Sequence, residues 1–581
     1  MSGHRASDGD GWWASGSGDT GFEAAAAAPR SGCNFWLRQR ARFCGHPTRP
    51  GFDVCANHGG CAEPRVPCPA DPSHTVAAAR LQHHLRTCTA VKLAAARQAQ
   101  PYCRPDANAG SDGDEPPPGE GDGATAAEAW PSEGVRAAYA AVAADPFARG
   151  VARRRLQLAV ALGRAGFVAL LRKVDAAHAA LTAAHPCTPS VLGGADAEDD
   201  GELLAFTKSV DPMNPYNAKH ARQQASLVAN MRVAGLLEGA PRCAYVELGA
   251  GKGWLSAWLA GASGARHLVL VDRMRGMTGK ADRRLRHTAL TRATLDLRDL
   301  DAAALLAHHA ATTAALAAEA AAAPPCEAAG PDSEAAGQQQ RQQEGRVAPL
   351  SGPFPWVAYG KHLCGAATDM ALRACLTAQA QGQAKLQRPA SVGDGAAGQE
   401  QQCCVFRGLC IAMCCHHRCS WRTFVGKREL AAFGIAPWEF EVLAYATSWA
   451  LCGHAAPAGE GGGSGSASED ERDAEEGGAA GAESEKEQQQ WQRQPSQQLQ
   501  PSPSQQPSNP PQELCAAFDP RSVFPSRESR MEFGLRCKQL IDAARSARLA
   551  AETPASAQPP RLLRYVPPSV SGESTALLWV L

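Results

Sequence analysis

The sequence predicts a protein of mixed α/β class, in which one large α/β domain follows two small Cys/His-rich modules and a helical segment. Three observations carry this prediction. Between about residues 206 and 450, short apolar runs alternate with longer runs of helical spacing, which is typical of a parallel sheet with crossover helices. Cysteine and histidine residues gather before residue 103. The stretch from Val135 to Ala184 has the apolar spacing of helices.

Composition and charge indicate which partners and which cellular location to expect. The 58 Lys and Arg residues balance the 58 Asp and Glu residues, so the overall charge does not indicate a polyanionic partner. Residues 26–100, however, hold ten basic and three acidic residues, an excess of +7 that favours phosphate contact. The N-terminus lacks an apolar signal segment, and no run of about 18 apolar residues is present. We therefore expect an intracellular protein, nuclear or cytoplasmic, without a membrane partner.

The 21 cysteines are consequently expected to serve metal binding or catalysis rather than disulfides.

Composition shifts divide the chain into segments. Residues 1–25 and the insertions near 311–348, 379–402 and 455–511 are predicted to be disordered surface segments. The predicted domains are two modules at 26–62 and 63–103, a linker at 104–130, a helical segment and linker at 131–200 that forms a spacer or cap, and the α/β domain at 201–581.

The second module has the stronger metal-ligand spacing, C-x5-H-x9-H-x3-C. Its residues can close a tetrahedral zinc shell, and the last two share one helix face at i,i+4. His83 competes with its neighbour but fits the spacing less well, so we assign it to the surface. The predicted ligands are Cys68, His74, His84 and Cys88.

The first module has a looser spacing, C-x10-C-x10-C-x2-H. Phe35, Trp36 and Phe43 are available as a small core, and metal binding would supply folding energy that so few apolar residues cannot. Cys61 and His46 are alternative ligands. The predicted set is Cys33, Cys44, Cys55 and His58, which makes two structural zinc ions in all.

Both modules resemble known zinc fingers. The first resembles the Cys-Cys-Cys-His finger that opens one eukaryotic family of tRNA 2'-O-methyltransferases. The second resembles the CHHC finger shared with RNA-associated proteins of the minor spliceosome. The resemblance implies that both fingers take part in RNA recognition.

A glycine-rich turn lies at residues 244–253, between a predicted strand and a predicted helix. Gly249, Gly251 and Gly253 allow a ligand to approach the backbone closely, and Glu247 at the strand end is expected to bind the ligand near a cationic or hydroxyl-bearing group. The run resembles the motif of Rossmann-like methyltransferases that cradles the methionine part of S-adenosylmethionine. Asp272 ends a second strand about 20 residues on and is expected to accept hydrogen bonds from the ribose of the cofactor.

Two alternatives accompany this cofactor site. Nicotinamide cofactors use a similar layout, although no plausible hydride-transfer site accompanies the turn here. Asp296, after the third strand-like run, is a candidate partner for the adenine amino group, with an ordinary helix N-cap as the alternative.

Two polar clusters follow later strand-like runs, at residues 356–369 and 408–421. In a doubly wound sheet this position faces the ligand crevice. The clusters resemble the K-H-L-C-G…T-D and C-C-H-H-R-C-S-W signatures of the same tRNA methyltransferase family, whose members modify the fourth nucleotide, in the acceptor stem. The resemblance extends to Lys219, His220, Gln223 and Gln224, and to residues 536–542.

Lys361 is our first candidate for accepting or relaying the hydroxyl proton, with His362, Asp369 or His416 orienting it. Its alternative role is contact with RNA phosphate. The residues Cys414–Cys419 are also a conceivable third metal site, but neighbours on an extended backbone point to opposite faces, so we favour a pocket or packing role. A nucleophilic Cys364 is not required, because a hydroxyl oxygen attacks a methyl group directly.

The sequence as a whole therefore predicts a methyltransferase that moves a methyl group from S-adenosylmethionine to a ribose 2'-hydroxyl in the tRNA acceptor stem. One alternative is a non-catalytic RNA-binding zinc-finger protein with a degenerate methyltransferase scaffold. Another is a methyltransferase acting on a base or a protein, for which the chain lacks an N-P-P-Y-like tetrapeptide after the glycine-rich turn. The sequence gives no indication of oligomeric state.

Overall fold

The computed structural model describes residues 32–37, 42–48, 50–55, 58, 64–111, 130–148, 150–192, 218–274, 280–322, 347–387, 404–451 and 518–581. The chain divides into two compact units, Met1–Arg97 and Gln98–Leu581, which are taken separately below. The predicted disorder of residues 1–25 and 455–511 lies outside the described residues.

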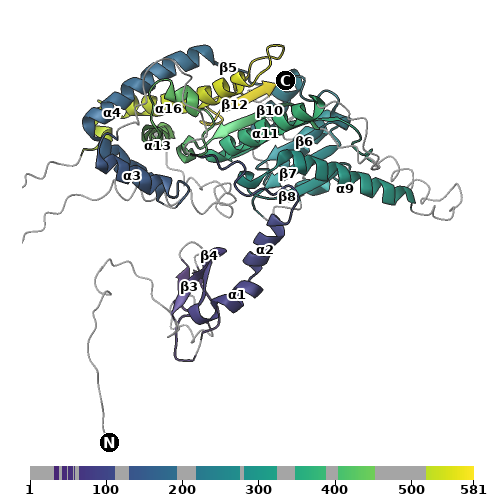
Figure 1. Ribbon diagram of the computed structural model, residues 1–581, viewed down its shortest axis with the longest axis horizontal. Coiled ribbons are helices and arrows are strands. Elements are labelled where there is room, and N and C mark those ends of the chain that lie inside the picture. Colours follow the sequence, from purple (N-terminus) through teal and green to yellow (C-terminus); the bar gives the residue numbers. More distant parts are fainter. Residues whose placement is uncertain are drawn as a thin grey trace, which may run out of the picture. The chain divides into compact units, whose positions relative to one another are not determined.

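The first unit contains short strands and two helices (Figure 1). Strands β1 (Trp36–Leu37) and β2 (Arg42–Phe43) pair antiparallel, as do β3 (Arg65–Cys68) and β4 (Asp71–Ala77). Helices α1 (Leu81–Thr87) and α2 (Thr89–Gln98) follow. Among its described residues, the buried apolar side chains are four cysteines and Ala77.

The aromatic core expected in this unit is not formed. Phe35 and Trp36 are 45% and 46% exposed, so these two rings do not contribute to a buried core. Phe35 instead stacks on the ring of His58, with centroids 4.0 Å apart, and Trp36 meets Phe43 edge to face at 4.9 Å. The buried positions of the described residues in this small unit are occupied instead by cysteine side chains and Ala77.

The second unit is organised around one eight-stranded sheet (Figure 1), in the order β5-β11-β12-β10-β9-β6-β7-β8. Strands β6 to β10 run parallel, whereas β12 is antiparallel to both of its neighbours, β10 and β11. The strands are β5 (Cys187–Pro189), β6 (Ala244–Leu248), β7 (His267–Asp272), β8 (Ala289–Thr294), β9 (Phe354–Cys364), β10 (Cys404–Cys414), β11 (Arg561–Arg564) and β12 (Thr575–Val580). The mixed α/β class with a mostly parallel sheet is thus confirmed.

Helices cover both faces of this sheet. Val246 and Val269 point to a core shared with α9 (Ala302–Ala322) and α11 (Ala366–Gln387). Tyr245 and Leu268, one residue along each strand, point to a core shared with α6 (Ala218–Val233) and α7 (Trp254–Ser263). This alternation buries both faces, as expected for parallel strands.

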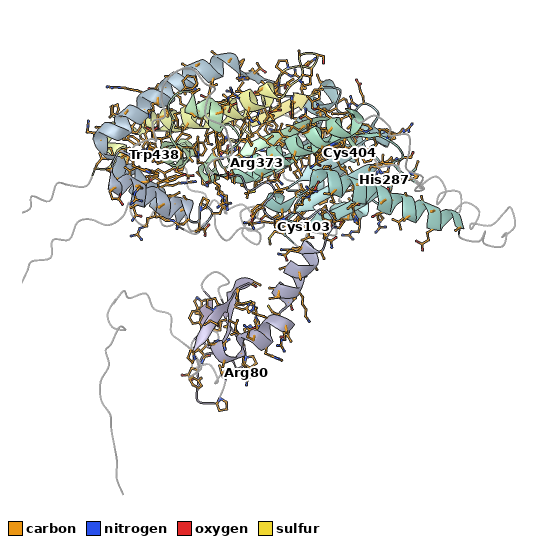
Figure 2. The ribbon with its side chains drawn as sticks, in the orientation of Figure 1. Arg80, Cys103, His287, Arg373, Cys404 and Trp438 are labelled. Carbon is orange, nitrogen blue, oxygen red and sulfur yellow. The ribbon has the colours of Figure 1, made fainter. Side chains whose placement is uncertain are left out.

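A third apolar core lies in a helical layer made of α3 (Glu133–Ala143), α4 (Val151–Ala184), α13 (Pro437–Ala446) and α16 (Arg527–Ala551). Figure 2 labels Trp438 of α13 in this layer and Cys404 at the start of β10. The helices expected between Val135 and Ala184 are present, and they pack into the second unit rather than acting as a spacer. Short helices α8 (Lys280–Arg284) and α12 (Lys427–Ala431) complete the unit.

Several elements run further than the sequence indicates. Helix α9 continues to Ala322 and α11 to Gln387, into the beginnings of two predicted insertions. The remaining parts of both insertions lie outside the described residues, except for residues 347 and 348. Strands β9 and β10 extend through Cys364 and Cys414, so both polar clusters begin inside strands instead of after them. No helix among the described residues is long and apolar enough to cross a membrane.

Candidate metal centres and active site

The second Cys/His cluster is assembled by β3, β4 and α1. Cys68 ends β3, His74 lies in β4, and His84 and Cys88 lie in and just after α1. Their ligand atoms lie within 4.8 Å of one another: the sulfurs of Cys68 and Cys88 are 3.9 Å apart and the two imidazole Nε2 atoms 3.1 Å. The structure therefore brings together all four predicted ligands, in a set whose chemistry fits zinc.

Two details of this cluster distinguish ligands from bystanders. His83, the competing histidine, is exposed and stands outside the cluster. The Nδ1 atom of His74 faces the carboxylate of Asp71 at 3.4 Å while its Nε2 atom points into the cluster. A carboxylate in that position orients a metal-binding imidazole.

The first cluster gathers the other four predicted ligands. Cys33, Cys44, Cys55 and His58 place their ligand atoms within 4.8 Å of one another. His58 Nδ1 lies 3.3 Å from the Cys33 sulfur and 3.4 Å from that of Cys55. His46, an alternative ligand, contributes only a backbone carbonyl that accepts from Cys33 N–H, and Cys61 lies outside the described residues.

In the second unit, the strand order reverses between β6 and β9. From β6 the chain proceeds to β7 and β8 on one side, and β9 and β10 stand on the other. In open α/β sheets, ligands bind at such a reversal, outside the carboxyl ends of the strands. The glycine-rich turn follows β6 at this edge.

The glycines of the turn have the backbone conformations that the motif predicts. Gly249, Gly251 and Gly253 have φ values of +69°, +50° and +83°, which favour glycine. A Cβ on Gly249 would lie 2.8 Å from Leu363, whereas one on Gly251 would meet no atom within 4 Å. The turn thus offers an open face at Gly251 where a ligand can approach the backbone.

The acidic residues that follow or end β7 and β8, Asp272 and Asp296, differ in their hydrogen-bond partners. Asp272 accepts the backbone N–H groups of Gly251 at 2.8 Å and of Met274 at 2.7 Å, one on each oxygen. A carboxylate oxygen has a second lone pair, so Asp272 retains acceptor capacity for a ligand. Asp296 caps a short helix by accepting Arg298 N–H at 3.0 Å, which is the alternative role that its position indicated.

Glu247 is buried behind the turn. Its carboxylate accepts the backbone N–H of Ser256 at 3.0 Å and the Ser256 hydroxyl, which lies 2.6 Å from the hydroxyl of Tyr359 on β9. Burial raises the pKa of Glu247 to about 7, and it also raises the pKa of Tyr359 well above its usual range. The carboxylate thus ties the start of α7 to the strand end that precedes the turn.

The catalytic candidate Lys361 lies in β9, the strand next to β6. It is 6% exposed, and its Nζ lies 2.9 Å from Nδ1 of His220 on α6. His220 Nδ1 also lies 3.3 Å from the side-chain oxygen of Gln223. An amine and an imidazole at this distance can exchange a proton, so the pair fits acid–base chemistry.

The residues predicted to orient Lys361 have other partners. Asp369 is fully buried and accepts from the Arg545 guanidinium at 2.6 and 3.0 Å. His416 Nε2 lies 2.6 Å from Asp542, which Arg545 also approaches at 3.4 Å. These four residues form one buried network, so Asp369 and His416 have partners other than Lys361, and an orienting role for either one stays a prediction. The side chain of His362 lies outside the described residues.

The helical layer supports the segment that follows β10. Arg155 of α4 is buried, pairs with Glu441 of α13 and donates to the backbone carbonyl of His417 at 2.5 Å. Glu441 in turn accepts Ser420 Oγ at 3.0 Å and Trp421 N–H at 2.8 Å. The predicted helical segment therefore fixes the C-C-H-H-R-C-S-W region.

Several functional candidates were not identified from sequence. His220 was named only within a resembling run, and Arg292 of β8, which donates to the carbonyls of Gly251 at 3.1 Å and Lys252 at 3.2 Å, was not named. Arg545 was likewise missed. Each acts across the fold, so no local spacing signals its role.

Comparison with known proteins agrees with this geometry. The family model described as Methyltransferase TRM13 matches residues 222–318 and 345–580, and that described as a U11-48K-like CHHC zinc finger matches residues 65–89. The second match spans all four ligands of the second cluster. No solved structure matches the chain.

Curated relatives point to the same family. A Mus musculus protein named tRNA:m(4)X modification enzyme TRM13 homolog is 26% identical over 457 residues, covering 72% of this chain and 74% of its own. A protein named tRNA:m(4)X modification enzyme TRM13 from Oryza sativa subsp. japonica is 33% identical, covering 42% of this chain and 88% of its own. A protein of the same name from Eremothecium gossypii is 30% identical, covering 67% of this chain and 70% of its own.

Proposed function

The chain belongs to the Methyltransferase TRM13 family, and from that premise we propose that it transfers a methyl group from S-adenosylmethionine to the ribose 2'-hydroxyl of the fourth nucleotide of tRNA, in the acceptor stem. The observation that carries the proposal lies at the reversal point of the sheet. There a glycine-rich turn follows β6, and Lys361, buried on the adjacent strand β9, meets His220 of α6. The relatives named as tRNA:m(4)X modification enzymes support the substrate.

For the cofactor, we assign a Rossmann-like binding site to the carboxyl edge of β6 and β7. The order of β8, β7, β6, β9 and β10 corresponds to the first five strands of the doubly wound order, which supports this assignment. Gly249, Gly251 and Gly253 provide the cradle, Asp272 the acceptor for ribose hydroxyls, and Glu247 its support from behind. Asp296 keeps one carboxylate oxygen for an adenine contact. S-adenosylmethionine supplies an electrophilic methyl group when bound.

For the chemistry, Lys361 accepts or relays the proton of the attacking hydroxyl, and His220 holds its amine. Loss of a positioned proton acceptor typically costs about 100- to 10,000-fold in rate. The network of Asp369, Arg545, Asp542 and His416 positions the ends of β9 and β10 without touching the reacting atoms.

For the RNA, the two fingers, each holding one zinc ion, contact the duplex acceptor stem. The +7 excess of residues 26–100 supports phosphate contact, and duplex RNA is recognised mainly through shape and backbone. We place the activity inside the cell, in the nucleus or cytoplasm, where tRNA is processed.

The test is methyl transfer from labelled S-adenosylmethionine to unmodified tRNA transcripts by the full chain, with the modified nucleoside and its position identified by mass spectrometry. A 2'-O-methylnucleoside at position 4 is expected. Lys361→Ala should lose at least about 100-fold in kcat while retaining cofactor binding by calorimetry. Arg136→Ala, at an exposed pair with Glu133, serves as the matched control. A base-methylated product would contradict the chemistry, and tight RNA binding without transfer would favour the non-catalytic scaffold.

A further inference from the structure

Three cysteine thiols meet at the carboxyl ends of β9 and β10, apart from the two finger clusters. Cys364 ends β9, Cys414 ends β10 directly opposite it in the parallel register, and Cys415 follows. Their three sulfurs lie within 4.8 Å of one another, and those of Cys364 and Cys414 are 3.9 Å apart. The predicted roles in methyl transfer use none of them.

The backbone explains how two adjacent cysteines reach the same side. Side chains of consecutive residues in a strand point to opposite faces, which is why the sequence disfavoured a metal site here. Cys415, however, has a φ of +51°, in the left-handed region that residues other than glycine rarely adopt. This turn brings its sulfur beside that of Cys414, so the geometric objection is wrong for this pair.

Such a conformation costs about 1–2 kcal/mol for a residue with a Cβ. Residues held in this way cluster at functional sites, where the surrounding structure maintains them. Here the residue after β9, Gly365, packs closely against the segment that follows β10. Its N–H donates to Cys414 O at 3.1 Å, and a Cβ on Gly365 would lie 2.4 Å from the Arg418 backbone. The three thiols are therefore presented by a tightly built corner.

The sulfur separation matches metal coordination and not a disulfide. Tetrahedral bonds of ~2.3 Å to zinc place two sulfurs about 3.8 Å apart, whereas a disulfide needs about 2.05 Å. The corresponding separations are 3.9 Å between Cys68 and Cys88 in the second finger and 4.0 Å between Cys44 and Cys55 in the first. The Cys364–Cys414 separation thus matches one sulfur spacing in each finger cluster.

We propose that Cys364, Cys414 and Cys415 bind a third zinc ion, which ties the catalytic strand β9 to β10. Thiolate ligands select soft or borderline metals such as zinc. Among the described residues, no histidine, cysteine or carboxylate joins the three sulfurs as a fourth ligand. A water molecule would complete the tetrahedral shell, as in zinc sites that exchange a ligand. Cys364 and Cys415 are half-buried, which leaves a path for the ion.

Zinc content of the purified full chain, measured by plasma mass spectrometry, tests the proposal. Three zinc ions per chain are expected, with two in Cys415→Ser and two in the finger variant Cys88→Ser. Cys187→Ser is the matched control, because Cys187 is also half-buried but belongs to no cluster, and it should retain three. Two ions in the unaltered chain, or no loss in Cys415→Ser, would overturn the third site.

A second measurement avoids the risk that a variant fails to fold. The unaltered chain is treated with iodoacetamide before and after chelation, and labelling is located by peptide mass spectrometry. Cys364 and Cys415 should be protected until the chelator removes zinc, whereas labelling of Cys187 should not change. Labelling that is independent of the chelator, or that requires a reductant instead, contradicts a metal site. Neither measurement depends on methyl transfer.

Discussion

The finger unit and the sheet unit are held together in different ways. Among the described residues of the finger unit, burial falls on Ala77 and four cysteines that belong to the two ligand clusters. The sheet unit has three apolar cores, and it also buries a charge network around Arg545. Stability in the finger unit therefore depends on a few ligands, whereas in the sheet unit it is distributed over many contacts and a few ion pairs.

Removing one finger ligand tests this difference most strongly. Structural zinc contributes about 10–16 kcal/mol in finger peptides, so His84→Ala should unfold β3, β4 and α1 and release one ion. Hydrogen exchange should become fast across residues 65–88 and stay slow across 244–272. The neighbouring variant His83→Ala is the control, because His83 lies outside the cluster. Equal exchange in the two variants would contradict the assignment of ligands.

The next largest effect is expected in the sheet unit, at Arg545. Its guanidinium is fully buried and donates to Asp369 and Asp542, so Arg545→Met leaves Asp369 buried without its cation, whereas Asp542 keeps His416. Breaking such a pair costs about 3–5 kcal/mol, measured by denaturant unfolding. Arg548→Met, one turn along α16 at an exposed pair with Glu552, should cost less than about 1 kcal/mol. If both variants lost the same free energy of unfolding, the buried network would contribute no more to stability than an exposed ion pair.

These two sites also mark what the sequence could predict. Finger ligands and glycine-turn residues were identified because their role depends on spacing within a short segment: a tetrahedral shell or a tight turn needs fixed intervals. Arg545 pairs with Asp369 across 176 positions, and Lys361 meets His220 across 141. No periodicity encodes such pairs, which depend on how strands and helices are stacked. The left-handed turn at Cys415 was equally inaccessible, because cysteine gives no conformational signal.

The buried Glu247 should make the stability of the sheet unit depend on pH. Because its pKa is about 7 when folded, against 4.5 as the ordinary value, the folded chain binds more protons than the unfolded chain between these values. Stability from this residue should therefore be fully present below about pH 4.5 and fall by about 3 kcal/mol as pH rises through 7. Glu247→Gln should remove this slope in unfolding measured across the pH range. Glu238→Gln, at an exposed carboxylate, should leave it unchanged.

The smallest effect on stability is expected in the glycine-rich turn, where neither a metal ligand nor a buried ion pair is removed. Gly251 and Gly264 have φ values of +50° and +69°, and a Cβ on either would meet no atom within 4 Å. Alanine at either position should therefore cost only about 1–2 kcal/mol, from the backbone alone. Gly251, however, lies in the open face of the turn, so Gly251→Ala should also weaken S-adenosylmethionine binding about tenfold or more by calorimetry, equivalent to about 1.4 kcal/mol. Gly264→Ala, at the end of α7, should not. If both variants bind the cofactor equally well, the backbone at Gly251 is not part of its cradle, and the glycine there serves only the turn.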